Sequence, residues 1–253
     1  MNVVKIRDME FGSGVPKICV PLVEKTRFEL LRQTYSDLET SMDLIEWRVD
    51  WFENVEDIDE VCSVAHDLRT ILHEIPLLAT FRTKKEGGEK EISTEYYVKL
   101  NKALIDCGDV DIIDVELYTG DDEVKELVAY AHEKGVKVIM SNHDFYQTPS
   151  KEEIVHRLCL MQEKGADIPK IAVMPQSKKD VLILLEATNE MHEEHSDTPI
   201  ITMSMSSKGV ISRVCGEVFG SCLTFGACGK ASAPGQMVVK DLRNALMAIH
   251  KSF

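Results

Sequence analysis

The chain has 253 residues, of which 44% are hydrophobic and 28% are charged, which are the proportions of an ordinary globular protein. Its formal net charge of −14 argues against general nucleic-acid binding, because contact with a phosphate backbone requires clustered Lys and Arg. The apolar runs are far too short for a membrane span, and the first residues lack the features of a cleavable signal. We therefore expect a cytoplasmic protein that binds neither nucleic acid nor membrane.

The seven cysteines include no C-x-x-C pair, and most lie in apolar runs. Free cysteine in such a run behaves as a small buried hydrophobe. We therefore expect a reducing compartment, no disulfide framework and no zinc site. Cys228 lies in a glycine-rich stretch, but no histidine is close to it in the sequence, which disfavours a role as nucleophile.

Predicted strands and helices alternate along the chain. Val3–Phe11 is predicted to form a strand or hairpin. The strands predicted after it are Pro16–Val23, Asp43–Asp50, Ile75–Arg82, Asp111–Leu117, Val136–Asp144, Ile168–Pro175, Pro199–Ser206 and Ser221–Gly229. The predicted helices are Arg27–Thr40, Val55–Glu74, Thr94–Cys107, Asp122–Lys134, Ser150–Lys164, Lys178–His192, a short one around Ile211–Val218, and Gln236–Ser252.

Eight strands, each followed by a helix, favour a parallel sheet, and eight is the number that closes into a (β/α)₈ TIM barrel. The runner-up is an open doubly wound sheet, but no G-x-G-x-x-G follows the first strand and no Walker-type loop is present. No low-complexity linker divides the chain, so we expect residues 1–253 to form one domain. The N-terminal strand or hairpin is an extra element that could cover the floor of the barrel.

Charged residues alternate with apolar ones in three of the predicted strands. In Asp43–Asp50, the apolar Ile45, Trp47 and Val49 share one face, and Glu46 and Arg48 share the other with Asp50. The apolar face of a barrel strand meets the helices, so we expect Glu46 and Arg48 to point inward.

Arg82 ends the third strand, and Asp114 and Glu116 point inward from the fourth. We interpret Asp114 and Glu116 as ion-pair partners that fill the barrel. Inward charge is costly to bury, so we interpret Glu46, Arg48 and Arg82 as the lining of a polar pocket for an anionic, hydroxylated substrate.

Lys170 lies in the middle of the buried strand Ile168–Pro175. A lysine there must pair with a carboxylate or lose its proton, and a neutral amine is a nucleophile that forms an imine with a ketone. Arg48 and Arg213 are possible cationic neighbours that would lower its pKa. His143 ends the preceding strand, where a barrel places catalytic groups, and could move protons next to the imine.

Two features stay open on the residues alone. Glu86 either orients His143 or is an exposed loop glutamate. The glycine-rich segment 226–236, with Arg213 after the preceding strand, is either a phosphate cradle or a lid whose Ser232 and Gln236 touch the substrate. A phosphate cradle would indicate a class I Schiff-base aldolase acting on a sugar phosphate. A non-enzymatic binding barrel would leave the buried charges without a reason.

Several segments, in one order along nearly the whole chain, resemble the type I 3-dehydroquinate dehydratase (3-dehydroquinase) family. They are Glu46-Trp47-Arg48-Val49-Asp50, Thr80-Phe81-Arg82, Ser141-Asn142-His143-Asp144-Phe145, Pro169-Lys170-Ile171-Ala172-Val173-Met174-Pro175, Gly209-Val210-Ile211-Ser212-Arg213 and Ala231-Ser232-Ala233-Pro234-Gly235-Gln236. None alone is specific, whereas their combination is.

The resemblance implies a barrel, usually a homodimer, that converts 3-dehydroquinate to 3-dehydroshikimate and water in the shikimate pathway, toward chorismate and the aromatic amino acids, without metal or cofactor. It implies that Lys170 forms the Schiff base, that His143 is the general acid/base and that Glu86 is its partner. Arg213 is expected to bind the substrate carboxylate, while Glu46, Arg48, Arg82, Ser232 and Gln236 contact hydroxyls or close the site, so that the last loop is a lid. Pro21, where some members carry serine, and Tyr146, where histidine is frequent, depart from the family pattern.

Overall fold

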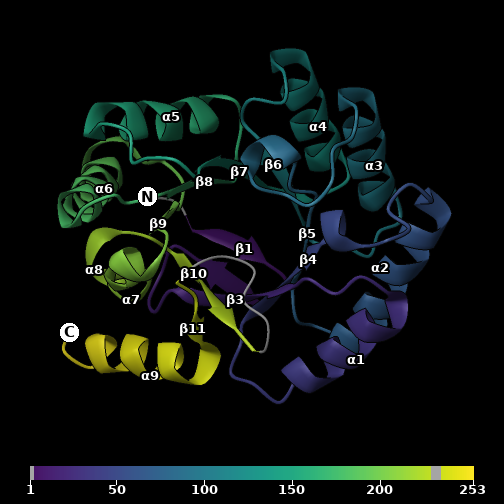
Figure 1. The fold of residues 1–253 in the computed structure, drawn as a ribbon, viewed down its shortest axis with the longest axis horizontal. Helices are drawn as coiled ribbons and strands as arrows, with labels where there is room; N and C mark the ends of the chain where they lie inside the picture. The colour runs from purple at the N-terminus through teal and green to yellow at the C-terminus, as the bar shows by residue number, and fades with distance from the viewer. Residues whose placement is uncertain (1–2, 229–234) are drawn as a thin grey trace.

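The computed structural model describes residues 3–228 and 235–253, in which strands and helices alternate (Figure 1). The strands are β1 (Val4–Ile6), β2 (Met9–Phe11), β3 (Lys17–Leu22), β4 (Leu44–Arg48), β5 (Leu77–Thr80), β6 (Ile112–Glu116), β7 (Lys137–Asp144), β8 (Ile168–Val173), β9 (Ile201–Ser204), β10 (Leu223–Ala227) and β11 (Met237–Val238). The helices are α1 (Arg27–Asp37), α2 (Ile58–Leu72), α3 (Thr94–Asp106), α4 (Asp121–Glu133), α5 (Lys151–Glu163), α6 (Lys178–Glu190), α7 (Val210–Val214), α8 (Gly216–Phe219) and α9 (Val239–His250).

Strands β3 to β10 form a closed parallel barrel. Each pairs with the next in sequence from β3 to β9, and β10 returns to β3 through the pairs Leu223–Lys17 and Thr224–Ile18. The barrel closes between β9 and β10 at a single bridge, where the Cys222 N–H donates to the Ile200 carbonyl at 2.9 Å. Helices surround these strands in the view of Figure 1. The predicted (β/α)₈ barrel is confirmed.

Inward side chains form layers that change from apolar to polar along the barrel. The lowest layer holds one apolar residue from each barrel strand: Cys19, Leu44, Leu78, Ile112, Ile139, Ile168, Ile201 and Leu223. Because side chains repeat on one face every second residue, the next inward positions include those of Glu46, Asp114 and Lys170. The intervening residues Ile45 and Trp47 pack outward among the helices, as the alternation predicted.

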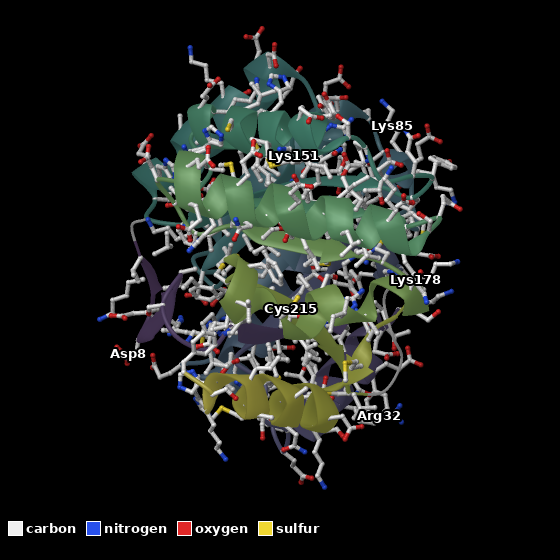
Figure 2. The ribbon with its side chains drawn as sticks, turned by 90° about the vertical axis from the view of Figure 1, so that its left-hand side faces the viewer. Asp8, Arg32, Lys85, Lys151, Lys178 and Cys215 are labelled. Atoms are coloured by element: carbon white, nitrogen blue, oxygen red, sulfur yellow. The ribbon has the colours of Figure 1, made fainter. Side chains whose placement is uncertain are left out.

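The hairpin β1–β2 closes the floor of the barrel. Ile6 and Phe11, with 3% and 0% of their surface exposed, pack into the lowest interior layer. Between the two strands, Arg7 donates to Asp111 at 2.7 Å and so fixes the hairpin to the start of β6. Figure 2 shows Asp8 of the hairpin at one end of the barrel, with Lys85 and Lys178 at the other. The described part of the chain therefore covers the floor of the interior, and the polar layers open at the carboxyl ends of the strands.

Two predicted elements have a different form in the structure. The second barrel strand ends at Arg48, and residues 49–51 form a 3₁₀ turn instead. Asp50 therefore does not continue the inward face of the strand; the turn brings its carboxylate back to Arg48, which holds it through two hydrogen bonds of 2.8 Å. The predicted helix over residues 211–218 is two short helices, α7 and α8, that meet at Cys215. Among the described residues, no helix is long and apolar enough to cross a membrane.

Candidate active site

A cavity opens at the carboxyl end of the barrel, as expected for catalytic barrels. It is lined by Glu46, Arg48, Arg82, Glu86, Gly87, His143, Phe145, Lys170, Ala172, Met203, Met205, Arg213, Phe225 and Gln236. Every candidate residue predicted from the sequence lies in this lining except Ser232, which falls outside the described residues. Residues from six strands and their following loops thus converge on one site.

Lys170 reaches this cavity from the middle of β8. Its side chain is 4% exposed, its Nζ lies 3.7 Å from the Asp114 carboxylate, and the same atom lies 4.6 Å from the centre of the Phe225 ring. An ammonium group is attracted both to a carboxylate and to an aromatic face. Lys170 therefore has a carboxylate partner, as one interpretation required, and its amine also faces the cavity, as the other required.

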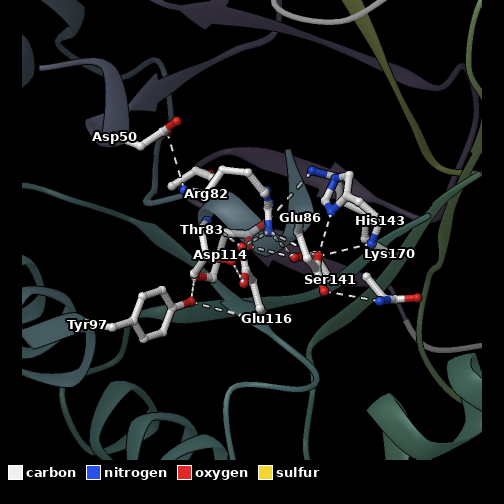
Figure 3. Close-up of polar contacts among 12 residues, drawn as sticks. Asp50, Arg82, Thr83, Glu86, Tyr97, Asp114, Glu116, Ser141, His143 and Lys170 are labelled. Carbon is white, nitrogen blue, oxygen red and sulfur yellow. Dashed lines mark hydrogen bonds and ion pairs between the residues drawn. The ribbon is translucent and has the colours of Figure 1, made fainter. Parts of the chain in front are cut away.

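Arg82 is the central cation of the barrel interior (Figure 3). Its guanidinium donates to Asp114 at 2.7 Å, to Glu116 at 2.9 Å and to the Ser141 hydroxyl at 2.9 Å. Burial alone would raise the pKa of Asp114, but the charge of Arg82 brings that pKa below its usual value. Asp114 and Glu116 are therefore interior ion-pair partners, as predicted. Arg82 lines the cavity with most of its donors already engaged.

Glu86 is buried and holds His143. One of its oxygens accepts from the His143 backbone N–H at 3.0 Å and lies 3.0 Å from the imidazole Nδ1. The interpretation of Glu86 as an exposed loop residue is wrong, because only 7% of its surface is exposed. With Glu86 ionised, Nδ1 carries the proton, which leaves Nε2 as the nitrogen free to exchange a proton.

Burial has opposite effects on the two members of this pair. It raises the pKa of the Glu86 carboxyl to about 8, with the nearby charge of Glu116 adding to the effect. It lowers the pKa of His143 well below its usual value, and the cations Arg82 and Lys170 add to that effect. Both shifts favour neutral forms, so the pair is best described as sharing a single proton near neutral pH.

Two further polar groups from β4 face the cavity. Arg48 is fixed by its two hydrogen bonds to Asp50 and therefore presents a rigid, preorientated guanidinium. Glu46 accepts from the Thr80 hydroxyl at 2.9 Å through one oxygen. Both occupy the inward positions that the alternation predicted.

Arg213 approaches the cavity from the side of the last strands. It lies on α7, is 1% exposed, and burial lowers the pKa of its guanidinium to about 10. A guanidinium remains charged at neutral pH even so, which makes this position suited to a carboxylate.

Sequence reasoning missed the apolar wall of the cavity. Met203, Met205 and Phe225 line it from β9, the residue after β9, and β10. The signal was present, because residues 201, 203 and 205 alternate in a predicted strand in the same way as Leu44, Glu46 and Arg48 do.

Of the two positions that depart from the family pattern, Pro21 is buried in β3 and Tyr146 is 86% exposed.

Phe145 completes the wall beside the His143–Glu86 pair. Its ring stacks on the His143 imidazole with centroids 6.3 Å apart and an interplanar angle of 20°. Gly87 lies under the same ring with φ of +84°, and a Cβ atom at Gly87 would come within 2.4 Å of the Phe145 side chain. The glycine therefore allows the ring to stack on the histidine.

Among residues 3–228 and 235–253, no group of three His, Cys, Asp or Glu side chains is arranged to hold a metal ion. The polar groups that converge in the cavity are an amine, an imidazole, carboxylates and guanidinium groups. With the barrel fold, they define the protein as a TIM-barrel enzyme whose active site lies at the carboxyl ends of the strands.

Comparison with known proteins narrows this class. The type I 3-dehydroquinase family profile matches residues 18–253, and the chain belongs to that family. It is 58% identical over 249 residues to a 3-dehydroquinate dehydratase of Clostridioides difficile (strain 630), covering 98% of each chain. It is 57% identical over 250 residues to one from Syntrophotalea carbinolica, covering 99% of each. The crystal structure of type I 3-dehydroquinate dehydratase from Clostridium difficile, with covalently modified comenic acid, superimposes with a TM-score of 0.97 at 57% identity, covering 100% of this chain and 99% of the other.

We predict that Gly87→Ala displaces Phe145 and loosens its stacking on His143. The new Cβ must push the ring aside and also strain a backbone with positive φ, so we expect a loss of about 2–3 kcal/mol in the free energy of unfolding, measured by denaturant titration. Gly108→Ala is the matched control, because Gly108 has φ of +74° with nothing within 4 Å of its Cβ position. Equal losses in the two variants would show that the Phe145 contact contributes nothing.

Proposed function

We propose that this protein dehydrates 3-dehydroquinate to 3-dehydroshikimate and water through an imine on Lys170, in the shikimate pathway toward chorismate and the aromatic amino acids. The observation that carries the proposal is the convergence of Lys170 and the His143–Glu86 pair on one cavity. Full-length identities of 56–58% to curated 3-dehydroquinate dehydratases support this reaction over a sugar-phosphate aldolase.

The first steps form the imine. The Lys170 ammonium releases one proton to water, and the neutral amine attacks the substrate ketone carbon. The carbonyl oxygen takes one proton from the attacking nitrogen and one back from water, leaves as water, and the product is a cationic iminium. The iminium withdraws electrons and acidifies the neighbouring CH₂. Asp114, 3.7 Å from Nζ, stabilises positive charge on this nitrogen both before and after the bond forms.

His143 then transfers the proton. Its Nε2 takes a proton from the acidified carbon, which gives an enamine, and Glu86 stabilises the imidazolium through Nδ1. The enamine electrons expel the hydroxyl two carbons from the imine carbon, and the imidazolium protonates that hydroxyl as it leaves as water. Water finally hydrolyses the conjugated iminium, which releases the enone and regenerates the amine. One water is lost overall.

The remaining candidates bind the substrate. We assign the substrate carboxylate to Arg213, because its buried guanidinium can bind a carboxylate bidentately. We assign the hydroxyls to Glu46, Arg48 and Arg82, and closure of the site to Ser232 and Gln236. Arg48 and Arg82 are immobilised by their own carboxylates, so they act as prepositioned donors and not as mobile charges.

We predict that borohydride added with 3-dehydroquinate traps a reduced adduct on the peptide that contains Lys170, while enone absorbance appears with untreated enzyme. Lys170→Ala abolishes both signals, because no other described lysine lines the cavity. Lys137→Ala is the control, since Lys137 pairs with Asp167 near the start of β7 and away from the cavity. An adduct on any other lysine, detected by peptide mass spectrometry, would contradict the assignment of the imine to Lys170.

We predict a different result for His143→Ala. Removing the proton-transfer group while keeping the amine leaves borohydride trapping intact but lowers kcat by about 10²- to 10⁴-fold. Steady-state absorbance kinetics and trapping on the same preparation separate the two effects. Full turnover in this variant would refute the assigned role.

We further propose that the protein is a cytoplasmic homodimer. This assignment rests on family membership alone. We predict that light scattering coupled to gel filtration gives about twice the chain mass of 28.5 kDa at micromolar concentration. A mass of one chain across that range would contradict it.

A further inference from the structure

An amide and a guanidinium lie behind the His143–Glu86 pair, on the side away from the cavity. Asn142 Nδ2 donates to Glu86 Oε1 at 3.1 Å, through the oxygen that does not bind His143. Arg157 Nη1 donates to Asn142 Oδ1 at 2.9 Å. Neither Asn142 nor Arg157 belongs to the described cavity lining.

Arg157 determines which way the Asn142 amide faces. A guanidinium can only donate, so the amide oxygen must face Arg157 and the amide NH₂ must face Glu86. The guanidinium is itself held by Glu153, one turn earlier on α5, at 2.6 Å, and lies 6.0 Å over the Tyr118 ring. Hydrogen bonds therefore run from Arg157, on the partly exposed surface of α5, through the Asn142 amide to the buried Glu86 carboxylate.

We propose that Arg157 and Asn142 are positioning residues that keep Glu86 a hydrogen-bond acceptor for His143. The proposal deepens the proposed function and rests on it for its catalytic consequence. An N–H donated to a carboxylate favours the ionised form, and the negative charge of that form is what stabilises the His143 imidazolium through Nδ1–H. Burial already raises the pKa of Glu86 to about 8, and without the amide donor that pKa would rise further, which would hold the shared proton more firmly on Glu86.

The environment of Glu86 makes this donor matter. The charge of Glu116 opposes ionisation of Glu86, and Asp114 does so more weakly. Arg82, 3.6 Å from Glu86, favours ionisation, but its guanidinium is already shared with Asp114 and Glu116. The groups that act on His143 are Arg82, Lys170 and Arg48, and all of them are cations that disfavour an imidazolium. Besides the His143 backbone N–H, Asn142 is therefore the described donor to Glu86 whose other contacts do not include a competing carboxylate.

The test measures the titration of Glu86 directly, by NMR of protein labelled with ¹³C at the glutamate carboxyl carbons, with Glu86→Gln identifying the signal. In the wild type the Glu86 midpoint lies well above that of an exposed glutamate. In Arg157→Met and in Asn142→Leu we expect it to rise by about one further pH unit, because one charge-assisted hydrogen bond is lost or misdirected. Arg157→Lys keeps a donor for the Asn142 oxygen, so we expect its Glu86 midpoint to stay close to that of the wild type.

Lys151→Met is the matched control. Lys151 lies on the same helix, but its ammonium pairs with Glu190 and Glu186 of α6, away from Asn142 and Glu86. An unchanged Glu86 midpoint in both Arg157→Met and Asn142→Leu would overturn the proposal, as would an equal shift in Lys151→Met. Arg157 lies outside the cavity lining, so Arg157→Met keeps the test valid if Asn142→Leu fails to fold.

Turnover gives the second readout. For Arg157→Met, we expect kcat with 3-dehydroquinate at pH 7 to fall about tenfold, KM to change less than twofold, and the acid limb of the kcat profile to move to higher pH. If the acid limb of the kcat profile stays at its wild-type pH in Arg157→Met, the proposed effect of Arg157 on catalysis is wrong. If the wild type does not turn over 3-dehydroquinate, the proposed function fails. A higher Glu86 midpoint in Arg157→Met would still support the proposed action of Arg157 and Asn142 on Glu86.

Discussion

The ion cluster around Arg82 is the constraint on which the rest of the interior depends. Carboxylates inside a barrel are tolerated only when a fixed cation neutralises them, since an unpaired buried charge costs several kcal/mol. Arg82 provides that cation to Asp114 and Glu116 at once, and the Tyr97 hydroxyl braces the backbone between them by donating to the Asp114 carbonyl and accepting from the Glu116 N–H. This cluster lets Lys170 and Glu86 lie buried in the interior of the barrel.

The layered interior explains how one chain builds both a stable barrel and a charged cavity. The lowest interior layer is apolar and is sealed by the hairpin through Phe11, while a larger apolar core lies between the strands and the helices. Polar side chains start only one inward position higher, at Glu46, Asp114 and Lys170. Charge is thus confined to the end of the barrel that opens to substrate, where helix N-termini also gather because each helix follows the carboxyl end of a strand.

Much of this arrangement could be predicted from sequence, because period-two alternation fixes which strand residues point inward. That rule placed Glu46, Arg48 and Lys170 correctly. It could not place Glu86, whose burial depends on a loop that folds back onto β7, or Asp50, which a 3₁₀ turn returns to Arg48. It also could not show that Arg157, on a predicted surface helix, reaches Asn142, because contacts between elements distant in sequence leave no local pattern.

Charge conservation links the site to the proposed chemistry. Changing the net charge of a buried cavity is costly, so a favourable mechanism keeps that charge constant during the chemical steps. The ammonium of Lys170 becomes an iminium with the same charge beside Asp114. The proton that His143 takes from carbon leaves again on the departing hydroxyl, so the His143–Glu86 pair also returns to its starting charge. The pair can cycle in this way only if Glu86 stays an acceptor throughout, which makes the orientation of the amide behind it as important as the two groups that face the substrate.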